Sequence, residues 1–151
     1  MRSAPRLPSW SLVALQLGLI AVLVLGTDLS SVRQALPPAI ALLAIGMALG
    51  LWTVSVNRWG NFNIRPEVKR GARLITNGPY RWIRHPMYSA VLLGTAAFVV
   101  ADSNAARVAL YVSLVIVLVI KAGREEEFLR AAFPEYDSYA AGTRRFIPMV
   151  W

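Results

Sequence analysis

The only histidine of the chain, His85, lies among residues that can bind a ligand and move a proton. An imidazole changes its charge near neutral pH, so it can accept a proton or donate hydrogen bonds. Arg81 and Arg84 precede it, and either could hold a carboxylate or phosphate of a substrate. Pro86 can begin a helix, whose free N–H groups attract anions. The pattern indicates an anion-binding site, and a membrane-interface belt of the same composition stays open as the alternative.

A run of three acidic residues follows some forty residues later. Glu125, Glu126 and Glu127 repel one another, so a ligand or a cation is needed to hold them side by side. Carboxylates of this kind can bind a ribose diol or accept a proton from an amine. The alternative is a solvated run of charges that pairs with Arg130 and Lys121 at i, i+4 spacing.

Aromatic and basic residues are mixed in the last segment. Tyr136 and Tyr139 could cover a purine or flank a sulfonium cation, because cations are attracted to the faces of aromatic rings. The alternative is a tail that its tyrosines and arginines hold at the lipid headgroups. One histidine and no cysteine cannot supply a zinc site, so we expect no metal. Neither a dinucleotide-binding motif nor a Walker motif is present.

The elements that must position these residues are long apolar helices. Hydrophobic residues make up 56% of the 151 residues and charged residues only 16%, and the apolar residues come in long blocks. This composition is typical of a chain that crosses a membrane several times. We expect a single-domain, all-α, polytopic membrane protein with about four spans, at about 10–26, 35–56, 86–101 and 105–121.

The third and fourth spans are expected to form a helical hairpin, since only Asp102-Ser103-Asn104 separates them. The fourth helix should continue beyond the membrane until Pro134, because good helix formers fill the intervening positions. Gly46 and Gly50 have the GxxxG spacing that lets another helix approach closely, unless their spacing is chance.

The distribution of positive charge predicts the orientation. The net charge is +8, and Lys and Arg concentrate in the connection 57–86, which the positive-inside rule places in the cytoplasm. Four spans then place both termini there too, so the polar segments 76–88 and 123–148 would share one membrane face. We expect a prokaryotic inner-membrane protein whose partners are lipids and a lipophilic substrate, not nucleic acid. The oligomeric state stays open.

Two motifs together resemble the isoprenylcysteine carboxyl methyltransferase and phospholipid methyltransferase family of integral-membrane enzymes. Residues 78–88 read GPYRWIRHPMY and match the family's G-P-Y-R-x-x-R-H-P-x-Y pattern. After the hairpin come further matching residues, namely Glu125-Glu126, Leu129, Phe133, Tyr136, Tyr139, Arg145 and Pro148. The resemblance covers about the C-terminal half, and the first two spans match only as hydrophobic helices.

The resemblance implies a cytoplasmic pocket for S-adenosylmethionine, formed by the C-terminal helix and tail. His85 and Tyr88 would hold the methionine end of the cofactor. Glu125 and Glu126 would meet its ribose or ammonium group, and residues of the tail would cover it. The implied cofactor-binding set is Tyr80, His85, Pro86, Tyr88, Glu125, Glu126, Tyr136 and Tyr139. The implied catalytic set is Arg84, Glu126 and Arg145.

The chain departs from the family's pattern at two places. A third acid, Glu127, leaves the register of the acidic pair open by one residue, although the spacing to Phe133 favours Glu125-Glu126. Phe133-Pro134 also replaces the more usual Phe-Gly, which leaves the path of the tail open.

The sequence thus predicts transfer of a methyl group from S-adenosylmethionine to a lipophilic acceptor, an isoprenylcysteine-like carboxylate or a lipid amine or acid. A carboxylate needs no general base, whereas an amine must lose a proton, which Glu125, Glu126 or His85 could accept. Two alternatives stay open: an NADPH-dependent membrane reductase of related layout, and a non-enzymatic membrane protein that binds lipid or a partner. The acceptor atom, oxygen, nitrogen or sulfur, also stays open.

Overall fold

The computed structural model describes residues 8–28, 36–61 and 73–147, and the regular elements in this part of the chain are helices. In chain order they are α1 (Ser9–Leu25), α2 (Leu36–Asn61), the 3-10 helix η2 (Gly78–Arg81), α3 (Pro86–Ala101), α4 (Ala105–Ala132) and α5 (Tyr136–Ala141). The expected all-α fold is confirmed. The four long helices coincide with the four predicted apolar runs, although α2 continues five residues past its predicted end.

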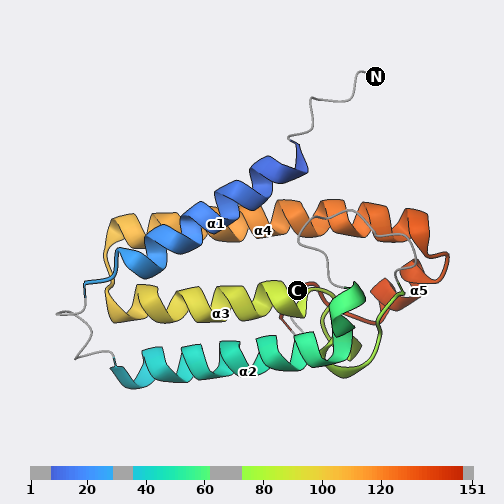
Figure 1. Ribbon diagram of the computed structural model, residues 1–151, viewed down its shortest axis with the longest axis horizontal. Coiled ribbons are helices and arrows are strands. Elements are labelled where there is room, and N and C mark those ends of the chain that lie inside the picture. Colours follow the sequence, from blue (N-terminus) through green and yellow to red (C-terminus); the bar gives the residue numbers. More distant parts are fainter. Residues whose placement is uncertain (1–7, 29–35, 62–72, 148–151) are drawn as a thin grey trace.

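The four long helices lie lengthwise beside one another and alternate in direction (Figure 1). The start of α1, the end of α2, the start of α3 and the end of α4 therefore share one end of the molecule with η2 and α5. We call this end, with η2, α5 and the residues around them, the site end. The arrangement brings both polar segments of the sequence to the same end of the bundle.

Local sequence explains where α3 and α4 begin and end. Pro86 begins α3, where its missing N–H leaves no helical hydrogen bond unmade. The side chain of Asn104 caps α4 by accepting a hydrogen bond from the main-chain N–H of Arg107, at 3.1 Å. The helix then continues to Ala132, two residues before Pro134. The predicted hairpin and the predicted extension of the fourth helix are both confirmed.

The helices α2 and α3 pack closely because α2 has a glycine at the contact. A Cβ atom on Gly46 would lie 2.8 Å from the main-chain nitrogen of Gly94 and 3.0 Å from the carbonyl oxygen of Ala90. One on Gly50 would make an ordinary contact, 3.6 Å from the Cβ of Ala90. The GxxxG spacing therefore does serve a helix contact, and Gly46 is the position that requires glycine.

Arg107 joins three helices at the end opposite the site end. Its buried guanidinium donates from Nη2 to the carbonyl oxygens of Leu23 at 2.6 Å and Phe98 at 3.3 Å. Nη1 donates to the carbonyl oxygen of Gly26 at 3.0 Å. These carbonyls belong to the last turns of α1 and α3, where a positive charge is favourable.

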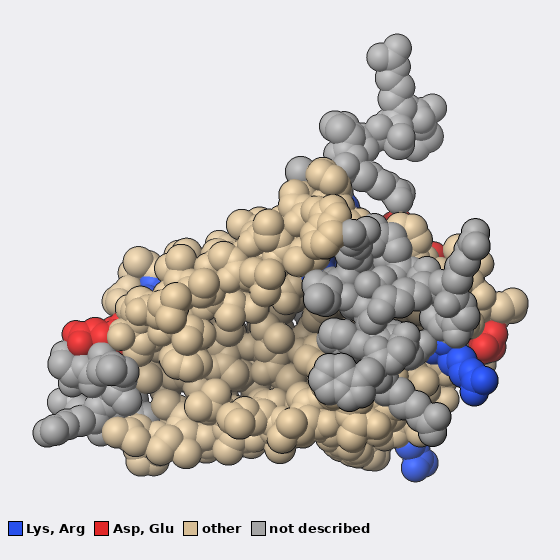
Figure 2. Space-filling view, in the orientation of Figure 1, with Lys and Arg blue, Asp and Glu red and all other residues tan. Residues whose placement is uncertain are grey.

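The outer surface of the bundle is largely apolar. On the face shown in Figure 2, charged side chains lie mostly toward the two ends of the molecule. Large hydrophobic side chains are exposed on α1, α2 and α4, among them Leu17, Leu25, Ile45, Leu51, Val112 and Ile116. Such a surface suits lipid better than water.

Two of the described helices are long and apolar enough to cross a membrane, residues 36–57 within α2 and the 28-residue α4. The helices α1 and α3 are shorter, with 17 and 16 residues. Four helices are therefore confirmed, whereas four membrane spans and a cytoplasmic site end stay predictions.

Replacing Gly46 with Ala is expected to destabilise the protein by about 1–3 kcal/mol, because the added methyl group meets main-chain atoms of α3 that cannot move away cheaply. Gly18→Ala is the matched control, since a Cβ there meets nothing within 4 Å and alanine favours the helix. Chemical unfolding in mild detergent, followed by circular dichroism, measures both. Equal stability of the two variants would contradict the close contact.

Candidate functional site

The tail that follows α5 lies beside the turn that precedes α3. Ile83 and Arg144 form an isolated parallel β-bridge. The main-chain N–H groups of Arg84 and His85 donate to the carbonyl oxygens of Arg144 and Arg145, at 2.7 and 3.0 Å. Main-chain hydrogen bonds thus bring together two polar segments that lie sixty residues apart in the sequence.

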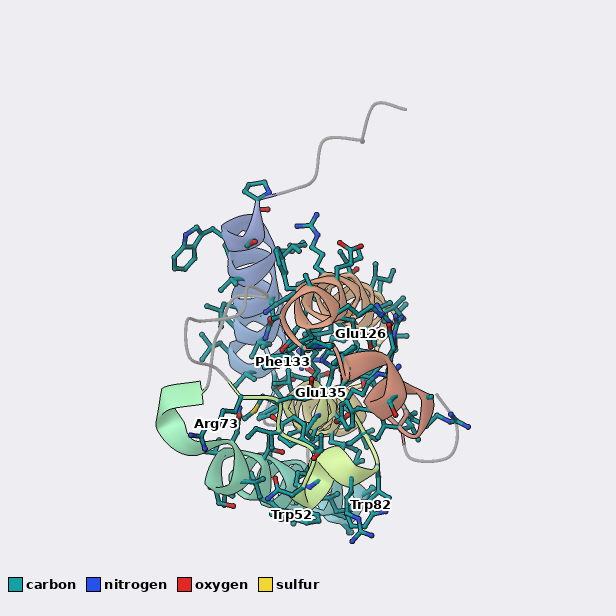
Figure 3. All side chains as sticks on the ribbon, turned by 90° about the vertical axis from the view of Figure 1, so that its right-hand side faces the viewer. Trp52, Arg73, Trp82, Glu126, Phe133 and Glu135 are labelled. Carbon is teal, nitrogen blue, oxygen red and sulfur yellow. The ribbon has the colours of Figure 1, made fainter. Side chains whose placement is uncertain are left out.

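Glu126 of α4 is fully buried, and cationic side chains surround its carboxylate. Arg84 donates from Nε to Oε1 at 3.0 Å, and Arg145 donates from Nε and Nη2 to the two oxygens at 3.1 and 2.9 Å. His85 Nε2 lies 3.3 Å from Oε1. A buried carboxylate is strongly unfavourable without such partners, so these cations stabilise its charge. Figure 3 looks onto the site end and labels Glu126 on α4, beside α5.

Arg84 connects α4 with α5 and the tail. Besides its bond to Glu126, its Nη1 donates to the carbonyl oxygens of Ala140, at 2.9 Å, and Thr143. The hydroxyl of Ser89 on α3 donates to the carbonyl oxygen of Phe146 at 2.7 Å. The tail is therefore fixed to the site at several points along its length.

His85 lies between the two carboxylates of the acidic pair. Its Nδ1 lies 3.5 Å from Oε2 of Glu125, and its Nε2 faces Glu126. The hydroxyl of Tyr88 donates to the same Oε2 of Glu125 at 2.9 Å. The rings of His85 and Tyr88 stack, with centroids 5.3 Å apart and planes within 7°. Unlike Glu126, Glu125 keeps 32% of its side chain exposed, so it can also meet a ligand.

The surroundings of His85 favour its protonated form. Burial alone lowers the pKa of His85, but the hydrogen bonds and negative charges of Glu125 and Glu126 outweigh burial and raise it above the ordinary value of 6.5. As an imidazolium, the ring can donate from both nitrogens, one to each carboxylate.

Two tyrosines of α5 and one of η2 flank this cluster. Tyr139 donates from its hydroxyl to the carbonyl oxygen of Tyr80 at 2.8 Å, and burial raises the pKa of Tyr139 to about 12. Tyr136 is buried, and its hydroxyl has no hydrogen-bond partner among the described residues. Burial and the charge of Glu126 raise the pKa of Tyr136, so the hydroxyl keeps its proton. Its ring packs against Tyr139 and under the guanidinium of Arg130.

The structure brings the residues predicted from the sequence together. Arg84, His85, Tyr88, Glu125, Glu126 and Arg145 form one set of contacts, and Tyr80, Tyr136 and Tyr139 lie at the same end of the molecule. Pro86 is buried at the start of α3. Pro148 lies outside the described residues.

The structure also bears on the questions that the sequence left open. Glu125 and Glu126 contact His85, whereas Glu127 is exposed, which is the register favoured by the spacing to Phe133. After Pro134 the chain turns directly into α5. Arg81, the other arginine considered for anion binding, lies over the ring of the exposed Trp82, at 6.0 Å. Trp82 itself packs against Trp52 at the outer edge of the site end (Figure 3).

Sequence reasoning missed three residues that complete the site. Ser89 and Thr143 fix the tail, and Phe146 packs against the His85 ring at 5.9 Å. These contacts join segments far apart in the sequence, so no local pattern indicates them. Arg130, by contrast, lies 3.6 Å from Glu126, as its i, i+4 spacing suggests.

The raised pKa of His85 can be measured directly, because the chain has one histidine. NMR of histidine-labelled protein without a histidine tag should give a midpoint above 6.5, and Glu126→Gln should lower it. Because the folded protein holds this proton more tightly than the unfolded chain, His85 stabilises the fold below pH 6.5, and this contribution is lost as the pH rises through the raised pKa. A midpoint at or below 6.5 would contradict the description of the cluster.

Removing the charge of Glu126 should loosen the tail. Glu126→Gln leaves Arg84 and Arg145 without their buried counter-charge, so we expect a loss of about 3 kcal/mol in the free energy of unfolding and faster proteolysis after Ala141. Glu127→Gln is the control, since substitution of an exposed acid changes stability by about 0.5 kcal/mol or less. Chemical unfolding and limited proteolysis compare the two variants. Equal losses would show that the buried ion cluster does not hold the tail.

Comparison with known proteins gives two similar relatives. The chain is 36% identical over 112 residues to the nickel-cobalt-cadmium resistance protein NccN of Alcaligenes xylosoxydans xylosoxydans, which is 72% of this chain and 50% of that protein. It is 34% identical over 109 residues to the cobalt-zinc-cadmium resistance protein CzcN of Cupriavidus metallidurans, with 71% of this chain and 49% of that protein covered. The chain thus spans about half the length of these relatives.

A family match covers most of the elements that form the site. Residues 36–136 match the phospholipid methyltransferase family. The matched region begins with α2 and ends at Tyr136, so it includes η2, the α3–α4 hairpin and the acidic pair, whereas α1 and the tail lie outside it. Together with the two motifs and the contacts between them, this match shows that the chain belongs to the phospholipid methyltransferase family of membrane methyltransferases.

Proposed function

We propose that this protein transfers a methyl group from S-adenosylmethionine to a lipophilic acceptor at the membrane surface. The observation that carries the proposal is the contact of His85 with both Glu125 and Glu126. It joins the two motifs of a methyltransferase family in one cluster of polar and charged groups. The largely apolar outer surface supports an acceptor that reaches the site from the lipid.

The residues at the site fit the groups of S-adenosylmethionine. The partly exposed carboxylate of Glu125 suits an ammonium group or a ribose diol. Arg145, with 31% of its side chain exposed, suits the carboxylate of the methionine end. The buried hydroxyl of Tyr136 is a donor with no protein acceptor among the described residues. Because such a donor is costly to bury unpaired, an acceptor atom of a ligand would satisfy it.

The two carboxylates would have different tasks. Protein cations occupy both oxygens of Glu126, so we propose that it positions Arg84, His85 and Arg145. Oε2 of Glu125 contacts Tyr88 and His85, and part of this side chain remains exposed, so we propose that Glu125 binds the cofactor. Tyr139 and Tyr80 would hold α5 over the site.

When bound, S-adenosylmethionine would supply a methyl group on a sulfonium, whose loss leaves a neutral thioether. The main tasks of this chain's residues are therefore to bind the cofactor and the acceptor, to orient them toward each other and to exclude water. The methyl group itself needs little further activation. For an amine acceptor, Glu125 is the group that could take up the proton, since Glu126 is already fully paired. The names of the two relatives concern metal resistance and identify no acceptor.

The proposal predicts that purified protein in nanodiscs binds tritiated S-adenosylmethionine. Glu125→Gln should weaken binding about tenfold or more, because one charge-assisted contact is lost. Glu127→Gln, one residue along the same helix but exposed, should leave binding unchanged and is the matched control. Equilibrium dialysis of the three proteins gives the dissociation constants.

Absence of binding by folded wild-type protein would overturn the proposal. Equal binding by Glu125→Gln and wild type would overturn the assignment of Glu125. Oxidation of NADPH with reduction of an added lipid would favour the membrane reductase instead. If the protein shows no cofactor binding and no turnover, a non-enzymatic membrane protein is favoured.

A further inference from the structure

Gln16 is a polar residue on the packed face of an apolar helix. Leu12 precedes it by four residues on α1 and Leu23 follows it by seven, and both are buried. Residues at these spacings lie on one face of a helix. Leu23 packs there against Leu114 and Leu118 of α4. An amide on such a face is unfavourable without a polar partner, so its presence in α1 indicates a specific contact.

The partner of Gln16 is Lys121 of α4, which is buried. The ammonium of Lys121 donates a hydrogen bond to the amide oxygen of Gln16. The same ammonium lies 5.4 Å from the centre of the Tyr88 ring on α3, and the face of an aromatic ring attracts a cation. Figure 1 shows α1 crossing α4 at an angle. Two side chains from two other helices therefore fix the position of this ammonium.

The position of the ammonium matters because of Glu125. Lys121 and Glu125 lie four residues apart on α4, a spacing at which opposite charges can form an ion pair. In the structure, Oε2 of Glu125 accepts a hydrogen bond from the Tyr88 hydroxyl at 2.9 Å and lies 3.5 Å from Nδ1 of His85. Tyr88 thus contacts both groups, with its ring toward the ammonium and its hydroxyl toward the carboxylate.

We propose that Gln16 is a positioning residue for Glu125: it holds the ammonium of Lys121 at the Tyr88 ring and thereby leaves the carboxylate of Glu125 to the cofactor. The inference rests on the proposed function, in which Glu125 binds S-adenosylmethionine. It adds α1, which lies outside the region that matches the family, to the elements on which this binding depends.

Charge and burial explain why the amide is needed. A buried ammonium that loses an acceptor turns to another one, and the carboxylate of Glu125 lies one turn further along the same helix. An ion pair of Lys121 with Glu125 would compete with the ammonium group or the ribose diol of the cofactor for the same oxygens. Gln16 prevents this competition because it offers a neutral acceptor on the side of α1.

Substitutions of Gln16 test this role. Gln16→Met keeps the length of the side chain but removes its strong acceptor, so binding of tritiated S-adenosylmethionine in nanodiscs should weaken about fivefold. Gln16→Glu keeps an acceptor oxygen and should bind within about twofold of wild type. Leu17→Met is the matched control, since Leu17 is the exposed neighbour on the same helix, and it should leave binding unchanged.

Removal of the lysine distinguishes positioning from a general loss of packing. In the double variant Gln16→Met with Lys121→Met, no ammonium is left to pair with Glu125. We therefore expect it to bind the cofactor more tightly than Gln16→Met alone, and within about twofold of Lys121→Met alone. A double variant that binds no better than Gln16→Met would show that only packing was lost, and it would overturn the proposal.

The titration of His85 gives a second readout, which needs no cofactor. The charged and titratable groups around this ring are Glu125, Glu126, Tyr88, Arg84 and Arg145. Gln16→Met should turn Glu125 from His85 toward Lys121. NMR should then show a lower titration midpoint of His85 in Gln16→Met than in wild type, and Leu17→Met should keep the wild-type midpoint.

The two readouts separate this role from the proposed function. If wild type binds no S-adenosylmethionine but Gln16→Met lowers the midpoint of His85, the proposed function fails and the positioning of Glu125 stands. If wild type binds the cofactor and Gln16→Met changes neither binding nor midpoint, the positioning role is overturned and the proposed function stands. Circular dichroism checks that each variant folds. Should Gln16→Met not fold, Gln16→Ala has the same expected results, and wild-type values in it overturn the role.

Discussion

The buried charge of Glu126 is the constraint on which the site depends. A carboxylate with no exposure to water must be surrounded by donors, and the chain supplies them from two distant places, Arg84 and His85 before α3 and Arg145 in the tail. The path of the tail follows from this requirement, since a tail elsewhere would leave the charge of Glu126 under-compensated. An ion cluster of this kind contributes less to stability than to the choice of one arrangement.

Helix length explains why these groups meet at all. Three residues, 102–104, separate α3 from α4, so the helices run back along each other almost from their ends. With about 1.5 Å of rise per residue in both, the sixteen residues of α3 place Pro86 level with residue 120 of α4. Glu125 and Glu126 then lie about one and a half turns beyond, within reach of side chains from the residues just before α3. The turn length and the helix length together set the position of the acidic pair relative to the histidine.

This geometry also explains what could be predicted from the sequence and what could not. Apolar runs, proline positions and the short turn determine the four helices and the hairpin, because these depend on neighbouring residues. The meeting of His85 with Glu125 and Glu126 could be expected from two motifs whose spacing is typical of one family. The β-bridge of Ile83 with Arg144 and the contacts of Ser89 could not, because they depend on the tail's path in three dimensions. The same is true of Gln16, which lies in a helix with no motif.

Adjacent residues on a helix point about 100° apart, and this angle gives the two acids different surroundings. One carboxylate faces inward, where protein cations occupy both of its oxygens, and the other faces sideways, where part of it remains exposed. The cationic side chains of Arg84, His85 and Arg145 around Glu126 carry more positive charge than its carboxylate neutralises. Glu125 therefore lies beside a group of side chains that is rich in positive charge. Glu125 and Arg145 thereby offer a carboxylate and a guanidinium to the opposite charges of the proposed zwitterionic cofactor. The buried carboxylate of Glu126 thus fixes the positions of the cationic side chains that a charged ligand would meet.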